Sequence, residues 1–182
     1  MRNSEGRIVQ IRQRRLPHWT AESGTYFITF RLADALSPEL AKSIALRRTP
    51  HVYADRLLDR GCGRCWLRDE RVARIVDDAI RTFDFAQLHA WAIMPNHVHL
   101  PARLRPGMTL PEALRRLKGA TAREANKVLC SSGRFWQEES YDVLVHDQND
   151  LDRVIDYIEA NPSKAGLRGW PWLAIVDRRF SF

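Results

Sequence analysis

The chain has 182 residues, 45% of them hydrophobic and 28% charged, as in an ordinary globular protein with one domain and a normal core. Its 29 lysines and arginines outnumber 22 acidic residues, and the net charge of +7 favours a polyanionic partner. A membrane span needs roughly 18 consecutive apolar residues; the sequence has no such run, no apolar leader after Met1 and an odd count of three cysteines, so we expect a cytoplasmic protein without membrane or disulfide anchorage.

The first fifteen residues form a basic segment. It holds five arginines around a short apolar patch, and such a charge run is typical of an arm that orders weakly or only on binding. We therefore predict a basic arm over residues 1–15 and a single domain over residues 16–182. Arg12, Arg14 and Arg15 of the arm are candidate contacts to phosphates, because the arginine fork matches phosphate oxygens.

Strand and helix patterns alternate beyond the arm. β-Branched and aromatic runs predict strands, whereas apolar residues at three- and four-residue spacing predict helices. In chain order the sequence predicts a strand over 25–32, a helix over 37–46 continued over 52–58, a helix over 70–83, strands over 88–94 and 97–104, a helix over 109–129, a strand over 141–146 and a helix over 151–160. This order predicts an α+β fold, an antiparallel sheet with helices packed mainly on one face.

Local signals refine three of these elements. The run from Thr109 to Glu112 resembles a capping box at a helix start, and Asn161-Pro162 predicts the end of the last helix. Pro101 has no N–H to donate, so we expect either a broken hydrogen-bond ladder beside it or a strand edge there.

Two histidines stand on the strand that begins at residue 97. Side chains alternate faces along a strand, so His97 and His99 share one face and Val98 lies on the other. Two neighbouring neutral imidazoles are a ready pair of metal ligands. A catalytic zinc-type site has three protein ligands, so a third ligand is expected from elsewhere in the chain.

The last predicted helix carries a polar pair beside its buried stripe. On a helical wheel Tyr157 falls about 110° from the centre of the apolar stripe, and Asn161 lies on the same side one turn further along. A phenol and an amide therefore stand together on the flank of this helix. Each residue alone is more often structural, a boundary tyrosine or a helix-end asparagine.

Three segments carry a family resemblance. They are Trp91–Leu100, Gly133–Gln137 and Asp156–Leu167, and the similarity in order and spacing extends from about Leu16 to Leu167. The chain resembles the single-tyrosine HUH transposases and, more narrowly, the REP-associated tyrosine transposases.

The resemblance implies a fold, an activity and a site. The fold would be a ferredoxin-like α+β sheet, and the activity would be metal-dependent cleavage and rejoining of single-stranded DNA near imperfect hairpins. Tyr157 would be the nucleophile, and His97, His99 and Asn161 would hold Mg²⁺ or Mn²⁺. Members of this family act as monomers or homodimers. The chemistry suits these residue types, because a phenol with a pKa of about 10 needs activation and a cation held by nitrogen and oxygen ligands leaves positions for phosphate oxygens.

Further residues are candidate DNA contacts. Arg116, Arg123 and Lys127 are spaced by seven and four residues, so they line one basic helix face. Trp136 and its neighbour Phe135 are candidates for stacking on unpaired bases, although core packing is the expected role of at least one.

Two alternatives remain open at this stage. The first is a non-catalytic nucleic-acid-binding regulatory module on the same fold, which the basic arm and the sheet would also suit. The second is a metal-dependent hydrolase with water as the nucleophile. Tyr141 competes with Tyr157 as a nucleophile, but it lies on a predicted strand with no amide one helical turn away.

Overall fold

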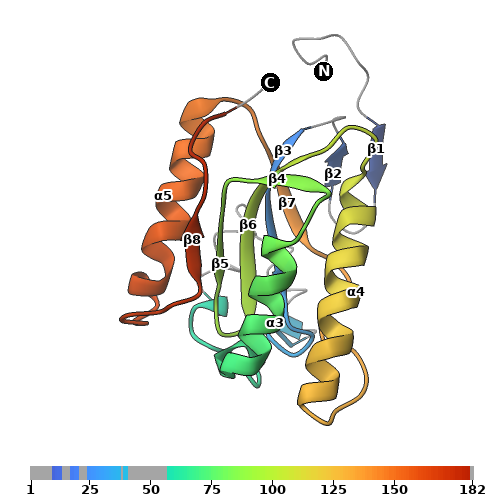
Figure 1. Ribbon diagram of the computed structural model, residues 1–182, viewed down its shortest axis with the longest axis vertical. Helices are drawn as coiled ribbons and strands as arrows, with labels where there is room; N and C mark the ends of the chain where they lie inside the picture. Colours follow the sequence, from blue (N-terminus) through green and yellow to red (C-terminus); the bar gives the residue numbers. More distant parts are fainter. Residues whose placement is uncertain (1–9, 14–16, 21–23, 38, 41–56, 181–182) are drawn as a thin grey trace.

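The computed structural model describes the chain except residues 1–9, 14–16, 21–23, 38, 41–56 and 181–182 (Figure 1). The predicted helical pieces over 37–46 and 52–58 therefore lie largely outside the described residues, as do Arg14 and Arg15. Ser37 accepts a hydrogen bond from the Leu40 N–H at 3.2 Å, as expected of the predicted helix cap.

A small hairpin precedes the main sheet. Strand β1 (Gln10–Gln13), which includes Arg12, pairs antiparallel with β2 (Pro17–Thr20). The boundary that we predicted between arm and domain, at residues 15 and 16, lies outside the described residues.

The main sheet has six antiparallel strands. They are β3 (Thr25–Arg31), β4 (Ala86–Leu88), β5 (Ala90–Ile93), β6 (His97–Leu104), β7 (Tyr141–Val145) and β8 (Leu173–Ile175). Their spatial order is β7-β3-β6-β5-β8, with β4 paired to β6. Numbered 1 to 4 in chain order, strands β3, β5, β6 and β7 lie side by side in the order 4-1-3-2, which is the ferredoxin-like arrangement predicted.

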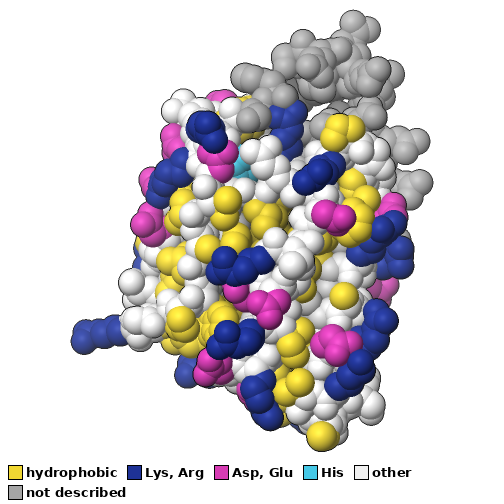
Figure 2. Space-filling view, viewed as in Figure 1, with side chains coloured by type: hydrophobic (Ala, Val, Ile, Leu, Met, Phe, Trp, Pro, Cys, Tyr) yellow, Lys and Arg dark blue, Asp and Glu magenta, His cyan; other side chains and the backbone are white. Residues whose placement is uncertain are grey.

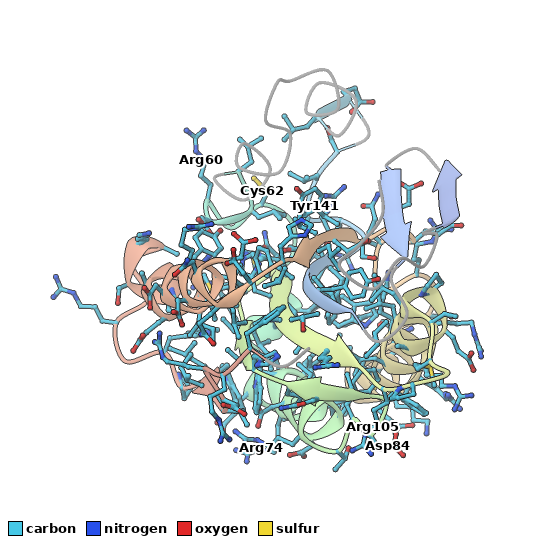
Figure 3. All side chains as sticks on the ribbon, turned by 90° about the horizontal axis from the view of Figure 1, so that it is seen from above. Arg60, Cys62, Arg74, Asp84, Arg105 and Tyr141 are labelled. Carbon is cyan, nitrogen blue, oxygen red and sulfur yellow. The ribbon has the colours of Figure 1, made fainter. Side chains whose placement is uncertain are left out.

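Helices cover both faces of this sheet. A short 3₁₀ turn, η1 (Trp66–Arg68), leads into α3 (Glu70–Arg81); α3 and α4 (Leu110–Val128) pack on one face, in the larger hydrophobic core with Val98 and Leu100 of β6. Helix α5 (Gln148–Lys164) packs on the other face, against a smaller core that includes Ala90 and Ala92 of β5. Seen end-on, α5 and α3 lie on opposite sides of the strands (Figure 3). None of the helices in the described part of the chain has the length and apolar character that crossing a bilayer requires.

Two helix ends differ from the sequence prediction. The capping box at Thr109 does not form: its side chain makes no cap bond, and Glu112 pairs instead with Arg116 one turn along. Helix α5 also continues through Pro162 to Lys164, because Leu151, Ile155 and Ile158 bury the helix and the proline removes only one donor close to its end.

Pro101 marks a bulge in the sheet. Leu88 pairs with Ala102, whereas Ala92 pairs with His99, so the β4–β5 segment has one residue more than β6 between these pairs. His89 donates its N–H to the Pro101 carbonyl at 3.0 Å, and a residue's N–H and C=O point to the same side of its strand. The missing donor of Pro101 therefore faces the bulge, which confirms the predicted break in the ladder.

Candidate active site

The two histidines of β6 face α5 and are fully buried. His97 and His99 each have 0% exposure, and their Nε2 atoms are 3.0 Å apart. The alternation of β6 directs them to the α5 side of the sheet, as the sequence predicted, while Val98 and Leu100 enter the opposite core.

Asn96 determines which nitrogen of His97 carries the proton. Its Nδ2 donates to the carbonyls of Leu58, at 3.1 Å, and Cys62, at 2.9 Å, so its Oδ1 is the atom 2.8 Å from His97 Nδ1. An amide oxygen only accepts hydrogen bonds, so neutral His97 is protonated on Nδ1 and its Nε2 carries a lone pair. That lone pair points at His99.

His99 is oriented by a hydroxyl from the neighbouring strand. The Thr29 Oγ1 atom on β3 lies 2.9 Å from His99 Nδ1, and Thr29 pairs with His99 in the strand register. A hydroxyl donates or accepts as needed, so it tolerates either tautomer of His99. When His99 donates from Nδ1 to Thr29, both Nε2 atoms of the pair present lone pairs to the same small volume, an arrangement that a cation relieves.

Burial keeps both histidines neutral. Desolvation lowers the pKa of His97 well below its ordinary value, and the charges of a protonated His99 and of Arg31 add to this effect. Desolvation lowers the pKa of His99 to about 3. Metal ligation requires neutral imidazoles, so this environment supplies the ligand form at neutral pH.

Asn161 of α5 reaches the histidine pair. Its side chain is 1% exposed, and Nδ2 lies 3.2 Å from His99 Nε2. Within the described residues its Oδ1 is buried without a hydrogen-bond partner. A buried amide oxygen without a partner is costly, and the two ends of an amide interchange by a simple flip, so this side chain is suited to give its oxygen to a cation.

Tyr157 lies one turn before Asn161 and packs against the same histidine. The centroids of its ring and that of His99 are 5.4 Å apart, in an edge-on arrangement. Phe27 of β3 completes an aromatic cluster, with its ring 6.0 Å from that of Tyr157 and 5.5 Å from that of His99. Lys164 Nζ lies 5.7 Å from the Tyr157 ring centre, which places a cation beside the phenol.

Several neighbours of this site were not found from the sequence. They are Phe27, Thr29, Arg31, Asp59, Asn96 and Lys164. Alternation along β3 puts Phe27, Thr29 and Arg31 on one face, so a strand-by-strand reading would have found them once the pairing with β6 was known.

Asp59 approaches the site from a different part of the chain. Its Oδ1 lies 3.9 Å from His97 Nε2. Burial raises the pKa of Asp59 to about 6, while the charge of Lys164 acts in the opposite direction. No local pattern in the sequence marks this residue, because its relation to His97 arises only on folding.

The donor set suits a divalent cation. Neighbouring ligands at right angles around a cation with bonds of about 2.1–2.2 Å lie about 3 Å apart. The separations of 3.0 Å between the two Nε2 atoms and 3.2 Å between His99 Nε2 and the Asn161 amide match that spacing. Two imidazole nitrogens and one amide oxygen form a mixed set that accepts Mg²⁺ or Mn²⁺.

The candidate DNA contacts on α4 lie away from this site. Arg116, Arg123 and Lys127 are exposed on the helix that covers the opposite face of the sheet. Arg116 pairs with Glu112 and lies 4.5 Å from the Phe85 ring centre, and Lys127 pairs with Glu124. Figure 2 shows Lys and Arg side chains along the edge over α4, interspersed with acidic ones. This helix face is therefore mixed in charge.

Trp136 is a core residue, which corrects its predicted role in stacking on bases. Its side chain is 4% exposed and packs edge-on against Phe30 and Phe135, with ring centres 4.9 and 4.8 Å away. Its indole N–H donates to Thr121 Oγ1 at 2.9 Å. Stacking on a base requires an exposed ring face, which a packed indole lacks.

Similarity to solved structures defines the class of fold. A structure described as a REP-associated tyrosine transposase bound to a REP hairpin superposes with a TM-score of 0.54 over 86% of this chain and 79% of that chain, at 18% identity. The fold is thus that of the HUH endonucleases. A crystal structure assigned as a transposase from Deinococcus radiodurans R1 has a TM-score of 0.36 and 18% identity, over 75% of this chain and 89% of that one.

The chain belongs to the IS200-like transposase family. The family model described as "Transposase IS200 like" matches residues 66–161, more than half of the chain, and this range includes His97, His99, Tyr157 and Asn161. The family predicted from the sequence motifs is confirmed. No curated protein sequence gives a significant match.

Proposed function

We propose that this transposase cleaves and rejoins single-stranded DNA through a covalent bond to Tyr157, with a divalent cation held by His97, His99 and Asn161. The observation that carries the proposal is the convergence of the two Nε2 atoms with the Asn161 amide, next to the Tyr157 ring. A binding module would not require two buried imidazoles whose Nε2 atoms face each other.

Tyr157 acts as the nucleophile in this proposal. Its phenolic oxygen forms a bond to the scissile phosphorus and loses its proton, while the bond to the 3′-oxygen breaks and that oxygen gains a proton. The products are a 5′-phosphotyrosine and a free 3′-hydroxyl. The phosphotyrosine retains the energy of a phosphodiester, so attack by another 3′-hydroxyl reverses the step and transfers the strand.

The surrounding residues position the reacting groups. A bound Mg²⁺ or Mn²⁺ would supply Lewis-acid stabilisation of the phosphate. Asn96 and Thr29 hold the imidazoles in the ligand orientation. Lys164 lies beside the Tyr157 ring, and Arg31, paired with His97 in the strand register, offers a guanidinium to the DNA backbone.

The substrate that we propose is DNA near a hairpin, and the narrower family branch is that of the REP-associated enzymes. The relative with the same fold was solved bound to a REP hairpin. The net charge of +7 suits a polyanion. Arg12, Arg14 and Arg15 at the N-terminus and Arg116, Arg123 and Lys127 on α4 are the proposed backbone contacts. We place the reaction in the cytoplasm, with the protein as a monomer or homodimer.

The test is a covalent adduct assay on a denaturing gel. Labelled single-stranded DNA carrying the imperfect palindrome that flanks the gene is incubated with protein and Mn²⁺, and separately with EDTA. We expect a shifted band that requires the metal and is absent in Tyr157→Phe. Tyr141→Phe is the matched control, since Tyr141 lies on β7 and should retain the adduct.

Either of two results would refute the proposal. An adduct that persists in Tyr157→Phe would exclude Tyr157 as the nucleophile. Hairpin binding without any adduct, unaffected by EDTA, would instead support the non-catalytic binding module.

A further inference from the structure

Asp59 places a carboxylate at the edge of the histidine pair. Its Oδ1 is buried and, within the part of the chain described, has no hydrogen-bond partner. It lies 3.9 Å from His97 Nε2, the nitrogen that the Asn96 contact to Nδ1 leaves with a lone pair. A buried carboxylate oxygen facing a neutral imidazole lone pair is unfavourable for both groups.

The turn that carries Asp59 is fixed in place. Gly61 donates its N–H to Leu58 O at 2.9 Å, and Arg64 donates to Asp34 Oδ2 at 3.0 Å. The two Asn96 bonds, to Leu58 O and Cys62 O, enclose the turn on either side of Asp59. The residue that orients His97 therefore also positions the backbone that carries Asp59.

The Asp59 carboxylate would supply negative charge that the other three ligands lack. Two neutral histidines and a neutral amide contribute no negative charge, whereas a divalent cation in a buried site needs some. The positive charge of Lys164 also acts on Asp59. A divalent cation placed here would add to that positive charge, so the site needs negative charge all the more. Mg²⁺ and Mn²⁺ both favour carboxylate ligands.

The separation of donors is compatible with ligation. Ligands of one cation with bonds of about 2.1–2.2 Å lie from about 3 Å apart, when adjacent, to about 4.3 Å apart, when opposite. The distance of 3.9 Å between Asp59 Oδ1 and His97 Nε2 falls within these limits. The described residues contain no ready cluster of three His, Cys, Asp or Glu side chains, so the Asp59 side chain must turn toward the cation to complete one.

We propose that Asp59 is a fourth protein ligand of the divalent cation and supplies the negative charge of the centre. This inference rests on the proposed function, because it assumes the cation at His97, His99 and Asn161. It extends that function by assigning a role to a residue from the turn before η1, far from the other ligands in the sequence.

The experiment measures Mn²⁺ binding to the full chain without DNA. Titration calorimetry gives the dissociation constant, and water-proton relaxation gives the number of waters on the bound ion. We expect Asp59→Asn and Asp59→Ala to weaken binding about 10- to 100-fold. Asp59→Ala should also add one water to the bound Mn²⁺. Asp84→Asn and Asp84→Ala are the matched controls, because Asp84 is exposed and lies far from the turn that carries Asp59. Cys62, three residues after Asp59, marks this turn in Figure 3, and Asp84 lies on the opposite side of the molecule.

Stability provides a second readout that a purely structural role would not produce. In the metal-free protein, both Asp59 variants remove a partly buried carboxylate whose Oδ1 has no hydrogen-bond partner among the described residues, so they should be at least as stable as the wild type. The increase in melting temperature on adding Mn²⁺ should be smaller in both Asp59 variants. A metal-free protein strongly destabilised by Asp59→Asn would count against ligation and indicate a structural role.

The outcomes separate this inference from the proposed function. Unchanged affinity in the Asp59 variants, with binding lost in His97→Ala, would overturn the role of Asp59 and leave the metal site intact. Weaker binding without an added water would place Asp59 outside the ligand sphere and also overturn it. If wild-type protein bound no Mn²⁺, both the fourth ligand and the metal site would fall, and the adduct assay would then decide the role of Tyr157.

Discussion

The Asn96 side chain fixes His97 as the Nδ1-protonated tautomer, because both hydrogens of its amide are given to backbone carbonyls and only its oxygen remains to face His97. One buried amide thus sets the direction of a lone pair and anchors the turn that carries Asp59. The adjacent motif residues Asn96 and His97 act as one unit.

Asn96→Asp should destabilise the protein by about 1–3 kcal/mol, because a carboxylate cannot donate to the two buried carbonyls. Chemical denaturation followed by circular dichroism measures this change. Asn126→Asp is the matched control: Asn126 also donates to a carbonyl, that of Gly133, but in an exposed position, so its cost should be about 0.5 kcal/mol or less. Equal costs at the two sites would contradict the role of Asn96.

Thr29→Val should weaken Mn²⁺ binding about tenfold, because His99 Nδ1 loses the partner that orients the imidazole. Calorimetric titration measures the loss. Thr25→Val on the same strand is the control, since Thr25 Oγ1 is buried with no partner among the residues described and its removal should be neutral or stabilising. Unaltered Mn²⁺ affinity in Thr29→Val would show that the hydroxyl does not orient His99.

Gly63→Ala should destabilise the fold more than Gly107→Ala. Both glycines have positive φ, 82° and 78°, so both substitutions carry a similar backbone cost. A Cβ at Gly63 would lie 2.6 Å from the Asp34 carbonyl oxygen, whereas one at Gly107 meets nothing within 4 Å. The difference in unfolding free energy should be about 1–3 kcal/mol, and comparable losses would mean that the loop yields at no cost.

Trp136→Phe should lower stability by about 1–3 kcal/mol and leave hairpin affinity within about twofold of the wild type. The substitution removes the bond to Thr121 Oγ1 and leaves a small cavity in the core. Thermal denaturation and a filter-binding titration measure the two quantities. Loss of affinity with full stability would restore the role in stacking on bases.

Acidification should destabilise the protein partly through His89. Burial lowers the pKa of His89 below 6.5, an effect that Asp177 opposes and Arg103 supports. The unfolded chain then binds a proton near pH 6.5 that the native state does not, so this contribution to stability is present above pH 6.5 and is lost as the pH falls.

The pH dependence can be assigned with a substitution. His97 and His99 act in the same direction in the metal-free protein, so the His89 share is the difference between wild type and His89→Gln. Between pH 7 and 5 that difference in slope should approach about 1.4 kcal/mol per pH unit at most. The exposed His146→Gln serves as the control. Parallel curves for wild type and His89→Gln would contradict the prediction.

Periodic features of this chain could be predicted from the sequence, whereas contacts made at long range could not. Alternation along β6 put His97 and His99 on one face, and helical spacing put Tyr157 beside Asn161. The missing donor of Pro101 led us to expect a broken ladder or a strand edge, and the structure shows the broken ladder.

The residues missed lack any local pattern. Asp59 lies 38 residues before His97 in the chain and approaches it only through a turn that Asn96 holds. Trp136 was misassigned because an aromatic residue has the same appearance in a sequence whether its ring packs in a core or faces DNA. The end of α5 was placed too early because the buried contacts of the helix outweigh the local effect of Pro162.

Tyr157 and Asn161 share one helix, and that helix is attached to the sheet through the smaller of the two hydrophobic cores. The histidine pair lies on β6, the central strand of the sheet. Displacement of α5 would therefore withdraw the proposed nucleophile Tyr157 and the proposed metal ligand Asn161 in a single movement. Under the proposed mechanism, a protein with α5 displaced would lack both groups at once and would form no adduct with DNA.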